Sequence, residues 1–361
     1  MTERKQIKEY DILRVIVTLL VIVGHCVYAS IETNSYGLWD YSAYTESGLS
    51  IFYRLAGYAV ALIYTVHMPL YMMLSGALYK YAEKSSRGGY GSFRILCEKK
   101  AKNLLIPFFV VTLCYVTPLK YFSGYYAESK NILKDIFVGQ ILLQGNNHLW
   151  FLPVLFIIFL LVYLMDLWFP SSAMIKLAIL FVAYCFSDLI PVALIRLPLN
   201  YAFWFYMGCC FEGQREKINY HIEQRPFKLA FVAGLWVILA AIISKLIPSE
   251  GAFLFISKLS RAICALIGCY AIYGCSYLLA KTNLSKNTVF MDIRKNTLGL
   301  YLYSDPLNYV ILFLAVQWFG GSVFSTDLGA LCLCSARFFI TATVAYGVSY
   351  VLRKCRIKYL C

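Results

Sequence analysis

Charged residues are scarce in this sequence. Only 14% of the 361 residues are Asp, Glu, Lys or Arg, whereas 60% are hydrophobic. A soluble protein of this length could not remove so much apolar surface from water. The shortage of charge therefore excludes a soluble globular fold. No stretch between the apolar runs is long enough for a sizeable soluble domain.

Cysteine pairs at metal-binding spacing are also lacking. Most of the 13 cysteines lie inside apolar runs, where a thiol behaves as a small apolar group. The pair "CC" at 209–210 and the triplet "CLC" at 332–334 have no second ligand pair at zinc spacing. The loops expected on the outer side of the membrane hold almost no cysteine. We therefore predict neither a metal site nor a disulfide framework.

The sequence instead contains repeated apolar runs of about 17–25 residues, each long enough to cross a hydrocarbon core about 30 Å thick. They predict an all-α, polytopic integral membrane protein in which residues 1–361 form a single membrane domain. Residues 31–55 are expected to form an outer loop, and residues 132–144 an amphipathic helix at the interface. The predicted membrane helices, about ten, cover residues 11–30, 56–79, 103–119, 149–166, 173–190, 197–212, 227–247, 260–280, 297–317 and 330–352.

The formal net charge of +14 would suggest a nucleic-acid partner in a soluble protein. Here the charges alternate with the predicted helices. If the N-terminus is cytoplasmic, two thirds of the 33 lysines and arginines fall in cytoplasmic segments. Cytoplasmic loops of membrane proteins carry this excess. We therefore predict cytoplasmic N- and C-termini, contact with membrane lipids and no nucleic-acid partner.

The first apolar run carries two groups that are costly in hydrocarbon, Arg14 and His25. They lie eleven residues apart, which places them on one helix face about 16 Å apart along the axis. Ionisable groups inside a membrane are candidates for function. The alternatives are an arginine that snorkels to the interface and a histidine that bridges two helices.

The second and third runs add polar candidates. His67, Ser75 and Gly76 lie in "HMPLYMMLSG". The Ser–Gly pair would also suit close helix packing, and His67 would also suit the outer interface. Lys99 and Lys102 are one helical turn apart at the start of the third run. Either they hold a phosphate group or they only fix the topology.

Two later runs carry polar residues as well. His148 and Trp150 open the fourth run in "HLWFLPVLF". In the ninth run, Asp305 precedes Pro306 inside "LGLYLYSDPLNY". The sequence shows no partner for this carboxylate. It is therefore a functional candidate on the same ground as His25.

The first of these motifs resembles a known family. Arg14 and His25, with ten residues between them, resemble the first motif of acyltransferase family 3, bacterial membrane proteins that O-acylate surface sugars and related acceptors. "HMPLYMMLSG", which ends in Ser75–Gly76, is similar to the second motif. Lys99 and Lys102, before "LLIP", resemble the family's paired basic motif, with lysines where arginines are usual.

The resemblance extends over essentially the whole chain. "HLWFLPVLF" also resembles the family, and the number of predicted membrane helices agrees with it. Asp305 departs from the pattern, because many relatives have a histidine at this position. The four motifs occur in the family's order.

The resemblance implies an acyltransferase in the inner membrane of a bacterial cell, with no permanently bound cofactor. Acetyl-CoA, or another acyl-CoA, would be the cytoplasmic co-substrate, and a surface glycan or its lipid-linked precursor would be the acceptor. The implied catalytic residues are His25, as general base, and Arg14; the donor-binding residues are Lys99, Lys102, Ser75 and Gly76; and the acceptor-binding residues are His67, His148, Trp150 and Asp305.

Three alternatives remain open at this stage. The histidine could form a covalent acyl intermediate. The chain could export a polysaccharide, as some family members are thought to do, although the inverted repeats of many transporters are not visible. The other membrane-bound O-acyltransferase superfamily also uses an intramembrane histidine, but the arginine–histidine spacing does not favour it.

Overall fold

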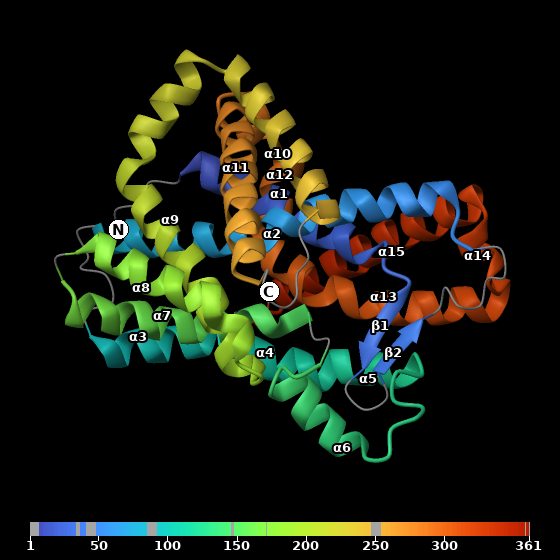
Figure 1. Ribbon diagram of the computed structural model, residues 1–361. Helices are drawn as coiled ribbons and strands as arrows, with labels where there is room; N and C mark the ends of the chain where they lie inside the picture. Colours follow the sequence, from blue (N-terminus) through green and yellow to red (C-terminus); the bar gives the residue numbers. More distant parts are fainter. Residues whose placement is uncertain are drawn as a thin grey trace.

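The structure is a computed structural model and consists mainly of long helices (Figure 1). Most helices run roughly along one direction, whereas α9 and α10 form an inverted V at the top of the view. The described residues are 7–33, 37–40, 48–84, 92–145, 148–170, 172–246, 254–357 and 359–360.

Within the described residues, a helical segment lies at each of the ten predicted positions. By length and composition, seven of them could cross a membrane, which confirms a polytopic helical membrane protein and makes ten an approximate number. The segments are α1 (Lys8–His25), α2 (Ile51–Lys84), the run Phe93–Phe122, the run His148–Trp168, α8 (Ala173–Phe186), α9 (Ala193–Gln224), α10 (Phe227–Leu246), α11 (Leu254–Ala280), α13 (Thr297–Phe319) and α15 (Asp327–Lys354).

The run Phe93–Phe122 is one continuous helix with two wider π-helical stretches. Pro107 and Pro118 each follow closely on a π segment. A proline ring removes one N–H and crowds the preceding turn, and a wider turn relieves this crowding. The parts are α3 (Phe93–Lys100), η2 (Ala101–Leu105), α4 (Ile106–Val111), η3 (Thr112–Val116) and α5 (Thr117–Phe122).

Shorter elements complete the chain. The helix predicted over residues 132–144 is present as α6 (Ile132–Asp135) followed by η4 (Ile136–Ile141). The expected loop 31–55 contains part of an antiparallel hairpin, which the sequence did not predict; residues 34–36 and 41–47 of it lie outside the described residues. The remaining elements are β1 (Ser30–Thr33), β2 (Gly37–Asp40), η5 (His148–Trp150), α7 (Phe151–Trp168), η6 (Ser187–Leu189), η8 (Asn283–Lys286), α12 (Thr288–Lys295) and α14 (Ser322–Ser325).

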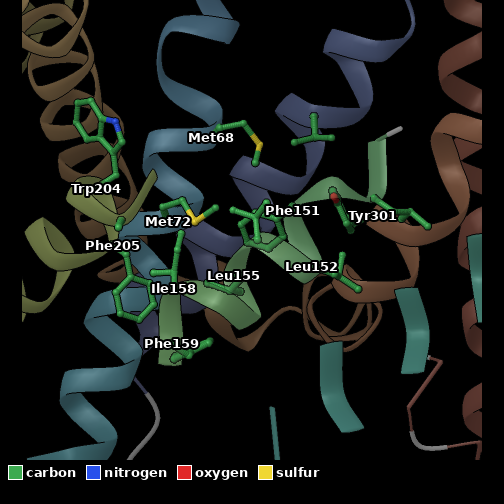
Figure 2. Close-up of a cluster of buried hydrophobic side chains, with 14 of the residues drawn as sticks. Met68, Met72, Phe151, Leu152, Leu155, Ile158, Phe159, Trp204, Phe205 and Tyr301 are labelled. Atoms are coloured by element: carbon green, nitrogen blue, oxygen red, sulfur yellow. The ribbon is translucent and has the colours of Figure 1, made fainter. Parts of the chain in front are cut away.

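The largest apolar core lies between α2, α7 and α9, and α13 closes one side of it (Figure 2). Met68 and Met72 of α2 lie on the side of the core that holds Phe151 of α7, and Phe159 lies further along α7. On the α9 side of the core lies Phe205, whose ring is 5.0 Å from that of Phe159. Aromatic rings at this separation add to the stabilisation from burial alone.

Two glycines let α2 and α9 approach each other closely. A Cβ atom on Gly76 would lie 1.8 Å from the carbonyl oxygen of Phe205, and one on Gly208 would lie 1.9 Å from that of Met73. No side chain fits at either position. Small residues permit such backbone contacts between membrane helices. Gly76 therefore has a packing role.

Ion pairs hold the first turns of α1. Arg215 of α9 contacts Glu9 at 2.8 Å and Glu212 at 3.0 Å, while Arg294 of α12 contacts Asp11 at 3.0 Å. Removing one partner of a buried pair leaves an uncompensated charge, which costs about 3–5 kcal/mol. These contacts fix the beginning of α1 against α9 and α12.

Helix α10 lies at the edge of the molecule. It packs on α11, and only 6% of its apolar stretch is buried inside the protein. Phe231 and Ile238 are among its exposed side chains. A helix that is apolar all round but mostly unburied is suited to contact with lipid.

Candidate active site

The site begins with a gap in the hydrogen bonding of α13. Pro306 has no N–H, so the carbonyl group four residues earlier, that of Leu302, loses its usual helical partner. His148 takes this position, because its Nε2 lies 3.1 Å from the Leu302 oxygen. A carbonyl oxygen only accepts hydrogen bonds, so Nε2 carries a proton in this contact. The Asp–Pro pair thereby ties α13 to η5.

Asp305, the residue before this proline, lies between two histidines. Its Oδ1 is 3.1 Å from Nδ1 of His25, and its Oδ2 is 3.5 Å from Nδ1 of His148. The Asp305 side chain is only 4% exposed. The carboxylate that has no evident partner in the sequence therefore has two. The fold joins α1, η5 and α13 at this point.

The two histidines differ in which nitrogens are engaged. Both ring nitrogens of His148 face acceptors, Leu302 and Asp305. His25 contacts Asp305 through Nδ1, and its side chain is 23% exposed. The Nε2 atom of His25 can therefore meet a substrate hydroxyl. A carboxylate on Nδ1 fixes the tautomer in which Nε2 accepts a proton, as in hydrolase triads.

Aromatic side chains surround the histidine–aspartate pair. The Tyr28 hydroxyl donates to Oδ1 of Asp305 over 3.4 Å. The Tyr64 ring lies 6.4 Å from that of His25, and its hydroxyl donates to the Gly24 carbonyl over 3.1 Å. His67, one turn further along α2, lies 4.8 Å from the Tyr64 ring. His25 and His67 thus have the Tyr64 ring as a common neighbour.

Two buried cations belong to the same region. Lys120 of α5 is buried, with Nζ 4.3 Å and 4.8 Å from the ring centroids of Tyr125 and Tyr309. Arg337 of α15 is fully buried and donates to the backbone carbonyl groups of His25 and Tyr28. Neither residue is among the site residues predicted from the sequence. Arg337 lies in the apolar run "LCLCSARFFITATV", so the rule that selected His25 also applies to it.

Arg14 and Ser75, two further predicted residues, take part in hydrogen bonds near Tyr71, Arg14 through its backbone and Ser75 through its side chain. The Thr18 hydroxyl donates to the Arg14 carbonyl over 2.8 Å and is hydrogen-bonded to the Tyr71 hydroxyl. Ser75 donates to the Tyr71 carbonyl over 2.9 Å. Along α1, Arg14 lies about three helical turns from His25, and Thr18 lies about two turns from it.

The other predicted residues lie apart from the histidine–aspartate pair. Trp150 stacks on Tyr201 of α9, with ring centroids 4.9 Å apart. Lys99 and Lys102 are exposed on α3 and η2. Lys100 between them instead packs its Nζ 3.4 Å from the centroid of the Phe159 ring.

Comparison with known proteins identifies the type of chain. The model of acyltransferase family 3, described as an acyltransferase domain, matches residues 7–352. No curated protein and no solved structure shows significant similarity to the chain. The matched range includes the histidine–aspartate pair and every other predicted site residue. The chain therefore belongs to acyltransferase family 3 and is a membrane acyltransferase.

Proposed function

We propose that the protein transfers an acyl group, in the first place acetyl, from cytoplasmic acyl-CoA to a hydroxyl group of a cell-surface glycan or its lipid-linked precursor. One observation carries this proposal. His25, in a chain of an acyltransferase family, has Asp305 on Nδ1 and leaves Nε2 for a substrate. This is the arrangement of a general base for a hydroxyl nucleophile.

In the proposed reaction, Nε2 of His25 takes the proton of the acceptor hydroxyl as its oxygen attacks the thioester carbonyl carbon. The C–O bond of the ester forms and the C–S bond of the donor breaks. The proton on His25 then passes to the departing thiolate, so the products are the ester and free CoA. Asp305 orients the ring and stabilises the positive charge that develops on it.

In this proposal, Asp305 and His148 therefore support the general base His25. Asp305 is 4% exposed and contacts both histidines, which leaves it little surface for an acceptor sugar. His67 is the better candidate for the acceptor side, because it adjoins the Tyr64 ring that flanks His25. Trp150, which stacks on Tyr201, has no proposed contact with the acceptor.

The donor would approach from the other end of α1. Lys99 and Lys102 are exposed basic side chains and would meet the phosphate groups of CoA. Arg14 precedes His25 by about three helical turns on α1, and Ser75, which donates to the Tyr71 carbonyl, follows His67 by about two turns on α2. The proposal places the lysines and both chain termini on the cytoplasmic side of a bacterial inner membrane.

Membrane vesicles from the source cell, supplied with radiolabelled acetyl-CoA, provide the test. The readout is label in mild-alkali-labile esters of the glycan fraction, at matched protein abundance. We expect His25→Ala and His25→Gln to lower transfer about 10²–10⁴-fold, because neither side chain moves the proton. Asp305→Asn is expected to lower the rate and to leave abundance unchanged.

Two outcomes would overturn the proposal. Near-normal transfer in His25→Gln would mean that the ring serves only as a hydrogen-bonding group between helices, since glutamine can replace that bond. Loss of glycan export with intact acetylation in cells carrying His25→Ala would point to transport instead.

A further inference from the structure

Arg337 is an unusual residue for the interior of a membrane protein. Its side chain is 0% exposed, and no carboxylate among the described residues lies within ion-pairing distance of it. A buried guanidinium group needs acceptors for its donors and a partner for its charge. Its contacts therefore show what it does in the fold.

Two of those contacts are with the end of α1. Nη2 donates to the carbonyl of His25 over 3.0 Å, and Nη1 donates to that of Tyr28 over 2.6 Å. His25 is the last residue of α1, where carbonyl groups lack helical partners and carry partial negative charge. Arg337, from α15, caps this helix. The guanidinium carbon also lies 4.4 Å from the centroid of the Tyr28 ring.

The third contact leads to Asp305. Nε of Arg337 donates to Oδ1 of Asn308 over 3.1 Å, and the Asn308 amide nitrogen lies 3.5 Å from Oδ1 of Asp305. The same oxygen of Asp305 contacts Nδ1 of His25. The contacts thus form a closed ring: Arg337, Asn308, Asp305, the His25 side chain, the His25 backbone, and back to Arg337. The Arg337 side chain thus binds the backbone of His25 directly and reaches Asp305 through Asn308.

We infer that Arg337 is a positioning residue for acyl transfer, which fixes the backbone of His25 and the carboxylate of Asp305 relative to each other. The inference rests on the proposed function. Lysine at this position would keep the charge but could not serve three acceptors in a planar fork. A displacement of about 1 Å in such a pair can cost about 10²-fold in rate.

The test uses Arg337→Lys in the vesicle assay with radiolabelled acetyl-CoA. We expect the maximal transfer rate to fall by about 10–10²-fold, while the KM for acetyl-CoA and the thermal midpoint in detergent stay close to wild type. The matched control is Arg215→Lys, at a partly buried arginine of α9 that pairs with Glu9 near the opposite end of α1; this variant should keep the maximal rate. A normal rate in Arg337→Lys would overturn the inference.

A double variant of Arg337 and Asp305 distinguishes a positioning role of Arg337 from a merely structural one. If Arg337 acts through the pair, then Arg337→Lys with Asp305→Asn should lose little more than Asp305→Asn alone. Independent, multiplicative losses would overturn the inference. If the Arg337→Lys protein does not accumulate, Asn308→Ser is the second variant, because it breaks the same ring of contacts and keeps Arg337. An unchanged maximal rate in Asn308→Ser would overturn the inference. Failure of the proposed function itself would appear separately, as transfer in His25→Ala.

Discussion

His25 and His148 have the same side chain but different surroundings. Each presents Nδ1 to the Asp305 carboxylate, at 3.1 and 3.5 Å. Nε2 of His148 binds the Leu302 carbonyl, whereas His25 is partly exposed. The chemistry of a histidine is set by which nitrogen its neighbours use. Under the proposed function, this difference makes His25 the reacting ring and His148 a supporting one.

Three closely spaced lysines, Lys99, Lys100 and Lys102, allow a direct test of donor binding. Replacing Lys99 and Lys102 by glutamine should raise the apparent KM for acetyl-CoA about tenfold or more, because each lysine would otherwise make a charge-assisted bond to a phosphate. The measurement is the initial transfer rate in vesicles as acetyl-CoA is varied.

Lys100→Gln is the matched control, because Lys100 packs on the Phe159 ring instead of being fully exposed. It should leave the KM for acetyl-CoA unchanged. An unchanged KM in the double variant, or a loss of membrane insertion alone, would show that the two lysines only determine topology.

The sequence identifies the residues of the site better than their contacts. His25 and Asp305 are selected by the rule that ionisable groups inside membranes are candidates for function, and His148 by the motif that opens the fourth run. That Asp305 lies against both histidines does not follow from the sequence, because 280 positions separate it from His25. Lys120 lies at the end of its run, where a lysine is expected to snorkel to the interface. Its burial depends on Tyr125 and Tyr309.

At the scale of elements, the proline in α13 has a consequence that can be tested. Pro306→Ala restores an N–H group, which would compete with His148 for the Leu302 carbonyl. We expect the helix to remain stable and the transfer rate to fall roughly fivefold, the equivalent of one hydrogen bond of about 1 kcal/mol. Vesicle kinetics and the thermal midpoint in detergent measure the two effects.

Pro198→Ala in α9 controls for the general effect of removing a proline from a helix interior. It should not reduce the transfer rate. If Pro306→Ala also kept the full rate, the link between His148 and α13 would have no part in catalysis.

Helix positions follow from the apolar runs, but helix ends do not. The first helix ends at His25, where Arg337 caps it, and does not reach the predicted residue 30. Helix α9 continues to Gln224, well beyond the predicted residue 212, because its polar end packs on other helices. Arg215 of this extension, for example, binds Glu9. Long-range contacts of this kind decide where a helix stops, and a local pattern does not contain them.

For the whole molecule, the distribution of basic residues predicts that both termini are cytoplasmic. A reporter that is active only in the cytoplasm, fused to each terminus in turn, measures this directly. We expect activity from both fusions. A silent reporter at one end, with the fusion protein present in the membrane, would contradict an even number of crossings.

The exposed helix α10 also bears on how the protein responds to bilayer thickness. Its 20 residues span about 30 Å, close to the thickness of a hydrocarbon core. Because α10 packs mainly on α11, a bilayer that becomes thinner or thicker can tilt it without disturbing the core between α2, α7 and α9. We therefore expect α10 to accommodate hydrophobic mismatch at the edge of the molecule, away from the histidine–aspartate pair.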